Sequence, residues 1–431
     1  MIKTSPITTD KNCLKLFAPS KGRGDKEFFL DSQFIEWLSG FTDAEGNFNI
    51  TLRKLNDPLK AKANNYSSAM LTFQIGLHID DLPVLEKIKN KLNCGRISIS
   101  GFKCNYFVND IASLTQIIVP IFKFGAPAVN LNSSKYFQFL IFEEAVNLFK
   151  NKKHLTPEGR IKLLNLYFKM KEPYLAPSSK DFKLYGTPPM TSYWLGGFTD
   201  GDSTFSIGNY KPRLKFENHE KEIELFKRIK TFLNSNSKVI TSKPRKNRAL
   251  SSNPTVCLDI TEIHFLKKTI VPLYSSGILL SKKLKDFNDW CIVIELYYLG
   301  YHLLPQGKSL INEIKSRWNN FRLSSKTRIS EPSLAQAREG QRESNTSFDL
   351  RLNSLFLIPS PYEIKNGIRF KRGTNNLISE SLKIIATDNL NNRSLFSSIA
   401  ECSTTLKLDR AKIKNSLLSG EEYKNYKFSW G

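Results

Sequence analysis

The sequence predicts an α+β fold made of two similar halves, followed by a smaller C-terminal module. Three observations support this prediction. Residues 34–50 (FIEWLSGFTDAEGNFNI) recur as residues 193–208 (YWLGGFTDGDSTFSIG), several later segments recur in the same order, and a proline-rich stretch separates the copies. Each half should therefore repeat one order of helices and strands.

Each copy of the duplicated stretch is expected to begin as a helix. Residues that favour the N-cap position precede the apolar run in both copies, and they are Asp31, Ser32, Thr191 and Ser192. Two small residues four positions apart then share one helix face, which would let the two helices pack closely. These small residues are Gly40 with Ala44 and Gly197 with Gly201.

Each expected helix ends at an acidic residue, Glu45 in the first copy and Asp202 in the second. Two helices that pack side by side and end together would bring these carboxylates close to each other. Helix C-termini carry unpaired carbonyl groups and partial negative charge, so the paired ends favour cations. Oxygen ligands of this kind suit Mg²⁺, which one or two carboxylates plus substrate phosphates usually hold. The alternative is two acids at solvated helix ends.

Strands and a further helix are expected after each copy. Polar and apolar residues alternate over residues 47–51 and 204–207, with Phe48, Ile50, Phe205 and Ile207 directed into the core. In the first half we expect a strand at 71–78, a helix at 82–92 and a hairpin of 96–100 with 103–108. The recurring segments are 85–89 with 226–230, 118–122 with 270–274, and 154–159 with 302–307. Four of the five histidines are paired by this repeat (78 with 219, 154 with 302), which favours structural roles for them.

Composition points to a nucleic-acid partner. The 431 residues suggest two or three domains, and 64 Lys plus Arg against 40 acidic residues leave a net charge of +24. The six cysteines form no CxxC pair, so neither a zinc site nor a disulfide framework is indicated. No apolar run approaches the roughly 18 residues of a membrane-spanning helix. Residues 1–30 are expected to be a loose extension.

Residues 38–46 (LSGFTDAEG) and 195–203 (LGGFTDGDS) resemble the signature of the LAGLIDADG homing endonucleases, in the monomeric form with two motifs. The small, aspartate and final acidic positions match, whereas Ser203 replaces the usual closing glycine. The resemblance implies two pseudo-symmetric αββαββα half-domains that form a saddle of two antiparallel sheets along the DNA major groove. It implies a metal-dependent endodeoxyribonuclease that cuts both strands of double-stranded DNA.

The resemblance also implies roles for particular residues. Mg²⁺ would be held by Glu45, Asp202 and the carbonyl groups of Ala44 and Gly201, and metal-assisted hydrolysis needs no covalent enzyme intermediate. Polar or basic residues beside the carboxylates would be Gln74, Lys215, Lys135 and Lys283, and a lysine there could stabilise charge in the transition state. For each lysine the alternative is an ordinary surface position.

Alternation along the strands and hairpins predicts one polar face, which the resemblance implies would contact DNA; the alternative is a merely solvated face. In the first half it comprises Asn47, Asn49, Thr51, Arg53, Arg96, Ser98, Lys103 and Asn105. In the second half it comprises Thr204, Ser206, Tyr210, Lys238, Lys243, Arg245, Lys246 and Arg248.

After about Leu323 the resemblance to the nuclease core ends. Residues 324–349 are a flexible linker by composition, and a strand is expected at 383–387. Two short helices follow, the first capped by Ser398 and the second ending at Gly420. Residues 396–428 are similar to the nuclease-associated modular domain, a helix-turn-helix-like module. The second helix would offer Arg410, Lys412, Lys414 and Asn415 to a DNA groove.

The expected organisation is therefore an N-terminal extension (1–30), two half-domains (31–170 and 191–323) with a linker between them (171–190), and the C-terminal module (350–431). Two other functions stay open, an intron RNA maturase and a DNA binder without catalysis. Both acidic residues are present, which favours the endonuclease because RNA binding needs neither. Richness in Lys, Asn, Ile and Phe fits an AT-rich organellar genome, so we expect an intron-encoded mitochondrial protein.

Overall fold

The structure is a computed structural model that describes residues 13–18, 26–53, 66–124, 131–178, 190–242, 254–321, 347–365, 368–374, 376–378, 383–396 and 398–430. The chain divides into two compact units. The first comprises residues 1–205, 214–259 and 273–287, and the second comprises residues 206–213, 260–272 and 288–431. The linker expected at 324–349 lies largely outside the described residues, as do residues 179–189 of the linker between the halves.

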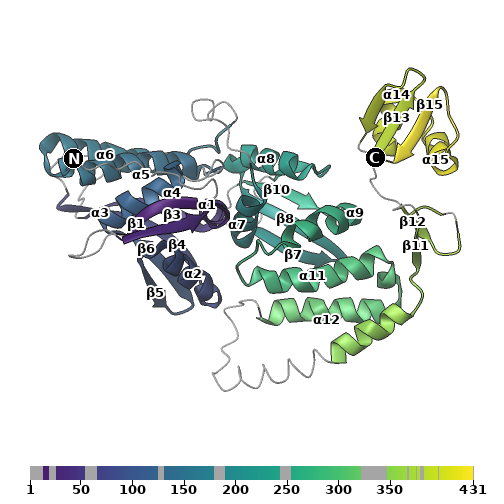
Figure 1. Cartoon of the computed structure of the whole chain (residues 1–431), viewed down its shortest axis with the longest axis horizontal. Helices are drawn as coiled ribbons and strands as arrows, with labels where there is room; N and C mark the ends of the chain where they lie inside the picture. The colour runs from purple at the N-terminus through teal and green to yellow at the C-terminus, as the bar shows by residue number, and fades with distance from the viewer. Residues whose placement is uncertain are drawn as a thin grey trace. The chain divides into compact units, whose positions relative to one another are not determined.

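The first half has the expected order of elements (Figure 1). Its strands pair in the order β3-β4-β6-β5, and every neighbouring pair is antiparallel. The elements are α1 (Ser32–Glu45), β3 (Gly46–Arg53), β4 (Ser68–His78), α2 (Leu82–Leu92), β5 (Arg96–Ser100), β6 (Lys103–Val108), α3 (Ile111–Ser113), α4 (Val119–Phe124), α5 (Lys135–Lys150) and α6 (Pro157–Lys169).

The second half repeats this order, and its four strands pair in the order β7-β8-β10-β9. The elements are α7 (Ser192–Asp202), β7 (Ser203–Gly208), β8 (Lys211–His219), α8 (Ile223–Leu233), β9 (Val239–Ser242), β10 (Thr255–Ile260), α9 (Ile263–Phe265), α10 (Val271–Ser275), α11 (Lys283–Tyr298) and α12 (Pro305–Phe321). The expected fold class, with a four-stranded sheet and covering helices in each half, is confirmed.

Local sequence signals explain the boundaries of the two duplicated helices. The side chain of Asp31 caps α1 by accepting from the backbone N–H of Phe34, and Thr191 caps α7 in the same way. After each helix the alternation places apolar side chains in the core, where Phe48 and Phe205 are 2% and 1% exposed. Their expected inward direction is confirmed.

Part of the N-terminal extension is ordered, contrary to our expectation. Strands β1 (Cys13–Ala18) and β2 (Lys26–Asp31) form an antiparallel pair that leads directly into α1. Leu14, Leu16 and Leu30 are buried in the core of the first half. The expectation of a loose extension was wrong for these residues, because two short strands carry too few apolar positions to be recognised individually.

Residues 347–372, most of which the sequence analysis could not place, pack on the end of α11. They form a helix over residues 347–357 and a hairpin of β11 (Tyr362–Lys365) and β12 (Ile368–Lys371). The buried guanidinium of Arg369 donates to the carbonyl oxygen of Tyr298 at 2.8 Å and stacks on the rings of Tyr298 and Tyr362. This hairpin is therefore anchored to the second half.

The C-terminal module contains the two expected helices and more strands than expected. The elements are β13 (Ile384–Asp388), β14 (Arg393–Phe396), α14 (Ile399–Leu406), α15 (Arg410–Ser419) and β15 (Tyr426–Trp430). Ser398 and Gly420 cap the helices as predicted. The three strands form a sheet in the order β14-β13-β15, so describing the module as helical was incomplete. The two missed strands have four and five residues and are largely exposed, which leaves little apolar alternation to detect.

The repeat-paired histidines make structural contacts. His78 and His219 each accept a hydrogen bond from the backbone two residues later, at the ends of β4 and β8. His154 and His302 stack on Phe149 and Tyr297, with ring centroids 3.9 and 3.8 Å apart. Within the described part of the chain, no helix is long and apolar enough to cross a membrane.

Candidate active site

Glycines set the distance between α1 and α7, which lie side by side (Figure 1). A Cβ atom added at Gly40 would lie 1.8 Å from the carbonyl oxygen of Trp194. One added at Gly197 would lie 1.9 Å from the carbonyl oxygen of Trp37. Any larger residue would overlap the facing backbone, so the packing of the two small-residue faces expected from the sequence is confirmed.

This packing brings the two terminal carboxylates together. Glu45 and Asp202 are the last residues of α1 and α7, and a Cβ atom at Gly201 would lie 3.1 Å from Cγ of Glu45. Burial raises the pKa of Glu45 and raises that of Asp202 to about 7; the neighbouring Glu45 charge also raises the pKa of Asp202. Two carboxyl groups that are costly to ionise side by side favour a cation between them.

Lys135 and Lys283 begin α5 and α11, and each reaches the end of the duplicated helix in its own half. Lys135 Nζ donates to the carbonyl oxygens of Thr42 at 3.1 Å and Ala44 at 2.7 Å. Lys283 Nζ donates to the carbonyl oxygens of Thr199 at 2.9 Å and Gly201 at 2.5 Å. The structure therefore brings both predicted lysines to the ends of the carboxylate-bearing helices.

The environment of Lys135 opposes its charge. Burial lowers the pKa of its ammonium group, while Asp202 and three further carboxylates favour the charged form. Lys135 and Lys283 in turn lower the pKa of both Glu45 and Asp202, against the dominant effect of burial. The lysines and the terminal carboxylates thus form one electrostatic cluster.

Two buried aspartates that the sequence analysis left unassigned connect the halves. Asp43 accepts a hydrogen bond from the indole Nε1 of Trp194 at 3.0 Å, and Asp200 accepts one from Nε1 of Trp37 at 2.9 Å. Each bond joins one half to the other. The signal was present in the sequence, because both tryptophans and both aspartates occupy matching places in the two copies.

The same aspartates hold the turns that precede the lysines. Asp43 accepts from the backbone N–H of Asn132 at 2.7 Å and from the Ser133 hydroxyl at 2.5 Å. Asp200 accepts equivalent bonds from Leu280 and Ser281. Burial raises the pKa of Asp43 to about 6, and these donors offset part of that shift.

Gln74 and Lys215 were also expected beside the carboxylates. Each forms a hydrogen bond with another residue of its own sheet. Gln74 donates to Asn105 at 3.0 Å, and Lys215 donates to Glu217 at 2.5 Å. Asp202 instead accepts a 2.5 Å hydrogen bond from Asn218, which the sequence analysis missed. Repeat matching could not have identified Asn218, because His219 pairs with His78 and the residue before His78 is Leu77.

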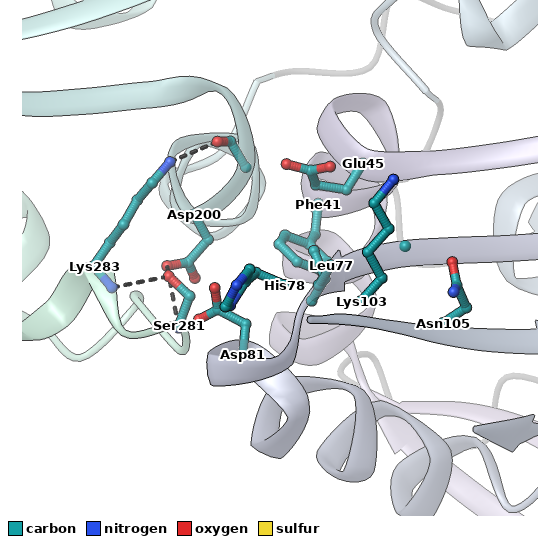
Figure 2. A pocket seen from close by; sticks show the side chains of 12 residues that line it. Phe41, Glu45, Leu77, His78, Asp81, Lys103, Asn105, Asp200, Ser281 and Lys283 are labelled. Carbon is teal, nitrogen blue, oxygen red and sulfur yellow. Dashed lines mark hydrogen bonds between the residues drawn. The ribbon is translucent and has the colours of Figure 1, made fainter. Parts of the chain in front are cut away.

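A pocket of about 490 Å³ opens at the end of the helix pair (Figure 2). Glu45 enters it from α1, Asp200 and Gly201 from α7, and Lys283 from the start of α11. Lys103 and Asn105 line it from β6, so the pocket joins the carboxylate cluster to the polar face of the first sheet. Lys103, Lys283 and Asn105 supply hydrogen-bond donors to the pocket, and Glu45, Asp81 and Asp200 supply acceptors and negative charge.

The predicted DNA-contacting residues of the first half share one face of the sheet. Register places Asn47 opposite Gln74, Gln74 opposite Phe107, and Phe107 opposite Arg96. Ser98 is likewise opposite Asn105. Alternate residues on the other face, such as Phe48 and Tyr106, are buried. Asn49, Thr51, Arg53 and Lys103 continue the polar face.

In the second half, Thr204 and Ser206 occupy the outward positions of β7, and Lys238 is exposed just before β9. Tyr210 does not extend this face, contrary to the prediction. The strand ends at Gly208, and Tyr210 adopts φ of 62° in the turn, where its hydroxyl accepts from Asn312 at 3.5 Å. Lys243, Arg245, Lys246 and Arg248 lie outside the described residues.

The four predicted contact residues of the C-terminal module lie on α15. Arg410, Lys412 and Asn415 are exposed, and Lys414 is partly buried. Ile413 and Leu417 face the module's core. The helix therefore presents a polar face to solvent.

The residues at the helix ends fit a hard divalent cation. Two carboxylates and the carbonyl groups of Ala44 and Gly201 form an all-oxygen donor set. Each carbonyl already accepts from a lysine, but a carbonyl oxygen has two lone pairs and can also face a metal. Among the described residues, no three His, Cys, Asp or Glu side chains gather into a metal site, so substrate phosphates and water would have to complete the coordination.

Comparison with known families gives two matches to the same family model, described as LAGLIDADG endonuclease. The matched residues are 38–146 and 195–294, one segment in each half. The chain is also similar to the uncharacterized mitochondrial protein RF1 of Saccharomyces cerevisiae, with 25% identity over 99% of this chain and 87% of that protein. It is 26% identical to the probable intron-encoded endonuclease 3 of Neurospora crassa over 65% of this chain, and spans 54% of that protein.

Solved structures share the fold. I-SmaMI bound to an uncleaved DNA target in the presence of calcium ions superposes with a TM-score of 0.54, at 22% identity, over 66% of this chain and 98% of that chain. I-AabMI bound to uncleaved DNA superposes with a TM-score of 0.53, at 24% identity, over 65% of this chain and 98% of that chain. The two pseudo-symmetric halves thus form a known two-domain architecture.

Proposed function

We propose that this chain, which belongs to the LAGLIDADG endonuclease family with two copies of its motif, cuts both strands of a specific DNA site. The observation that carries the proposal is the pair of carboxylates, Glu45 and Asp202, held together at the ends of two packed helices. Solved relatives are described as bound to DNA, and curated relatives are described as intron-encoded endonucleases. The polar sheet face supplies a surface for such a substrate.

The cluster of lysines and terminal carboxylates would act together with a divalent cation. We propose that this cation is Mg²⁺. When bound by Glu45, Asp202 and the carbonyls of Ala44 and Gly201, it would stabilise charge on the phosphate and lower the pKa of a water nucleophile. Lys135 and Lys283 hold their ammonium groups at the helix ends and offer positive charge to the phosphates. The mechanism needs no nucleophilic side chain.

We assign recognition of the DNA bases to the strands of the sheets. The major groove of B-DNA admits a β-ribbon and presents a distinct donor and acceptor pattern for each base pair. Asn47, Asn49 and Arg96 on the first sheet have side chains suited to adenine and guanine edges. Exposed cations on α15 would add contacts to phosphates. One chain carries both motifs, so a monomer suffices.

A mitochondrial location is part of the proposal, because relatives include a protein described as mitochondrial and others described as intron-encoded. The RNA maturase is the weaker candidate. Binding RNA requires neither Glu45 nor Asp202, and the deep, narrow major groove of A-form RNA would not admit the strands.

The central experiment changes the carboxylates. DNA sites cut by the protein are first selected from a randomised library. Glu45→Gln or Asp202→Asn should then reduce Mg²⁺-dependent cleavage about 1000-fold, a barrier increase of about 4 kcal/mol, with little loss of DNA binding. Glu86→Gln, on the exposed side of α2, is the matched control and should cut normally. Full cleavage by the variant that carries both substitutions, Glu45→Gln and Asp202→Asn, would refute the assignment.

A second experiment separates the two substrates. Binding to the selected duplex and to the corresponding intron transcript is measured over a range of salt concentrations. The DNA preference should survive moderate salt, whereas RNA binding through charge should fade. A transcript preference that persists at high salt, without DNA cleavage, would establish the maturase.

A further inference from the structure

Two acidic residues at equivalent positions of the repeat each make a side-chain contact with the opposite half of the nuclease. Asp81 is the N-cap residue of α2 and Glu222 is the N-cap residue of α8, so the two correspond in the repeat. Neither side chain caps its own helix. Each is directed to the turn before a lysine of the opposite half, and both turns belong to the first compact unit.

Glu222 makes the tighter of the two contacts. It is 3% exposed, and it accepts the backbone N–H of Ser134 at 3.0 Å and the Ser134 hydroxyl at 2.6 Å. A buried carboxylate with two such donors is strongly oriented. Ser134 directly precedes Lys135, so this contact joins the second half to the lysine of the first.

Asp81 makes the equivalent contact in the other direction. Its carboxylate accepts the backbone N–H of Lys282 at 3.1 Å, and Lys282 Nζ lies 3.8 Å from it and 3.1 Å from Asp80. These side chains are partly exposed, so solvent screens the ion pair. Lys282 directly precedes Lys283, which is therefore held by a weaker contact than Lys135.

A short chain of bonds connects each turn to the active-site lysine. The Ser133 hydroxyl accepts the backbone N–H of Lys135 at 3.2 Å, and the Ser281 hydroxyl accepts that of Lys283 at 3.2 Å. The turn thus sets the first residue of α5 or α11, from which the lysine side chain extends to the helix end. A displaced turn would displace the ammonium group.

We propose that Glu222 and Asp81 are positioning residues, that each orients the catalytic lysine of the opposite half, and that the two DNA strands are consequently cut under separate control. This inference rests on the proposed endonuclease function. The buried Glu222 contact makes the Lys135 side of the site the more rigid one, whereas the Lys283 side depends on the partly exposed contact of Asp81 with Lys282.

Strand-specific cleavage tests the proposal. Each strand of the selected duplex carries its own end label, and Lys135→Ala and Lys283→Ala identify the strand that depends on each lysine. Glu222→Ala should slow the Lys135-dependent strand about 10- to 100-fold, and Asp81→Ala should slow the other strand by a smaller factor. Glu222→Gln and Asp81→Asn keep a hydrogen-bond acceptor and should restore most of the rate. Equal slowing of both strands, or slowing of the opposite strand, would overturn the proposal.

If Glu222→Ala fails to fold, a milder substitution still tests the proposal. Ser134→Ala removes only the hydroxyl donor to Glu222 and should slow the Lys135-dependent strand several-fold. Cleavage of the two strands by Ser134→Ala at the ratio found for the unmodified protein would count against the proposal.

A second readout does not depend on cleavage. In the protein labelled with ¹⁵N-lysine, a buried, hydrogen-bonded ammonium group exchanges its protons slowly and gives a resolved signal, which Lys135→Arg and Lys283→Arg assign by its loss. Glu222→Ala should shift or broaden the Lys135 signal and leave that of Lys283 unchanged, and Asp81→Ala should do the reverse. If the protein cuts no DNA, the proposed function fails while this measurement still decides the positioning role. Unchanged signals in both variants would overturn it.

Discussion

Replacing Gly197 with alanine tests whether the close approach of α1 and α7 creates the active site. The added Cβ atom would lie 1.9 Å from the carbonyl oxygen of Trp37 and 2.7 Å from the backbone nitrogen of Phe41. An ordinary contact needs at least 3.4 Å, so the helices would have to separate by about 1.5 Å at this point. Both obstructing atoms belong to the backbone and cannot rotate away.

Two opposing contributions set the change in stability of the Gly197→Ala variant. Alanine is favoured over glycine within a helix by about 1 kcal/mol, which would stabilise the variant. Overpacking a core costs about 1–3 kcal/mol, and a clash with backbone atoms belongs at or above the upper end of that range. The clash should prevail, with a net loss of about 2 kcal/mol. Because a misplacement of about 1 Å can cost about 100-fold in rate, cleavage should fall by at least that factor.

Thermal denaturation and the cleavage rate at saturating Mg²⁺ measure the two effects. Gly208→Ala is the matched control, since its Cβ would meet nothing nearer than Cδ of Arg213 at 3.6 Å. The control should melt and cut like the unmodified protein. A Gly197→Ala variant that is equally stable and equally active would refute the reasoning, because the separation of the helices would then not matter.

Three further outcomes are expected. Trp37→Phe removes one of the donors to the buried carboxylate of Asp200 and should cost about 1–3 kcal/mol in chemical denaturation, whereas an unchanged midpoint would show that the cross-half bond contributes nothing. Burial raises the pKa of Asp202 to about 7, so the folded protein binds more protons than the unfolded chain; the resulting stability is full below about pH 4 and is lost as the pH rises through 7. Asp202→Asn should therefore lose less stability than the unmodified protein between pH 5 and 8 in metal-free buffer, and parallel curves would contradict this. A chain ending at Ile378 keeps Arg369 on Tyr298 and should still cut, but its DNA binding should depend less steeply on salt; an unchanged slope would exclude phosphate contacts by α15.

Much of the site could be predicted because its determinants are local and repeated. The caps at Asp31 and Thr191 and the terminal acids define two helices from neighbouring residues alone. The small residues within them indicated which faces pack, and the packing brings Glu45 and Asp202 together. Strand alternation likewise indicated which side of the first sheet is polar.

Contacts between distant and ordinary residues escaped this reasoning. The bond between Glu222 and Ser134 joins residues 88 positions apart, and that between Trp194 and Asp43 joins residues 151 apart. Nothing in a glutamate or a serine indicates such a partner, because the contact exists only where the two halves pack against each other. The turn at Tyr210 was missed for a related reason, since alternation alone does not show where a strand ends.

The sequence by itself determined the duplicated helices, their terminal carboxylates, the order of strands in each half and the strongly basic character of the chain. Each of these follows from side-chain chemistry and periodicity within a short window. Only the tertiary structure decided how the lysines reach the helix carbonyls, which acid supports which lysine, and that the hairpin of β1 and β2 belongs to the core. Those features depend on burial and on close approach between segments far apart in the chain, which no local pattern encodes.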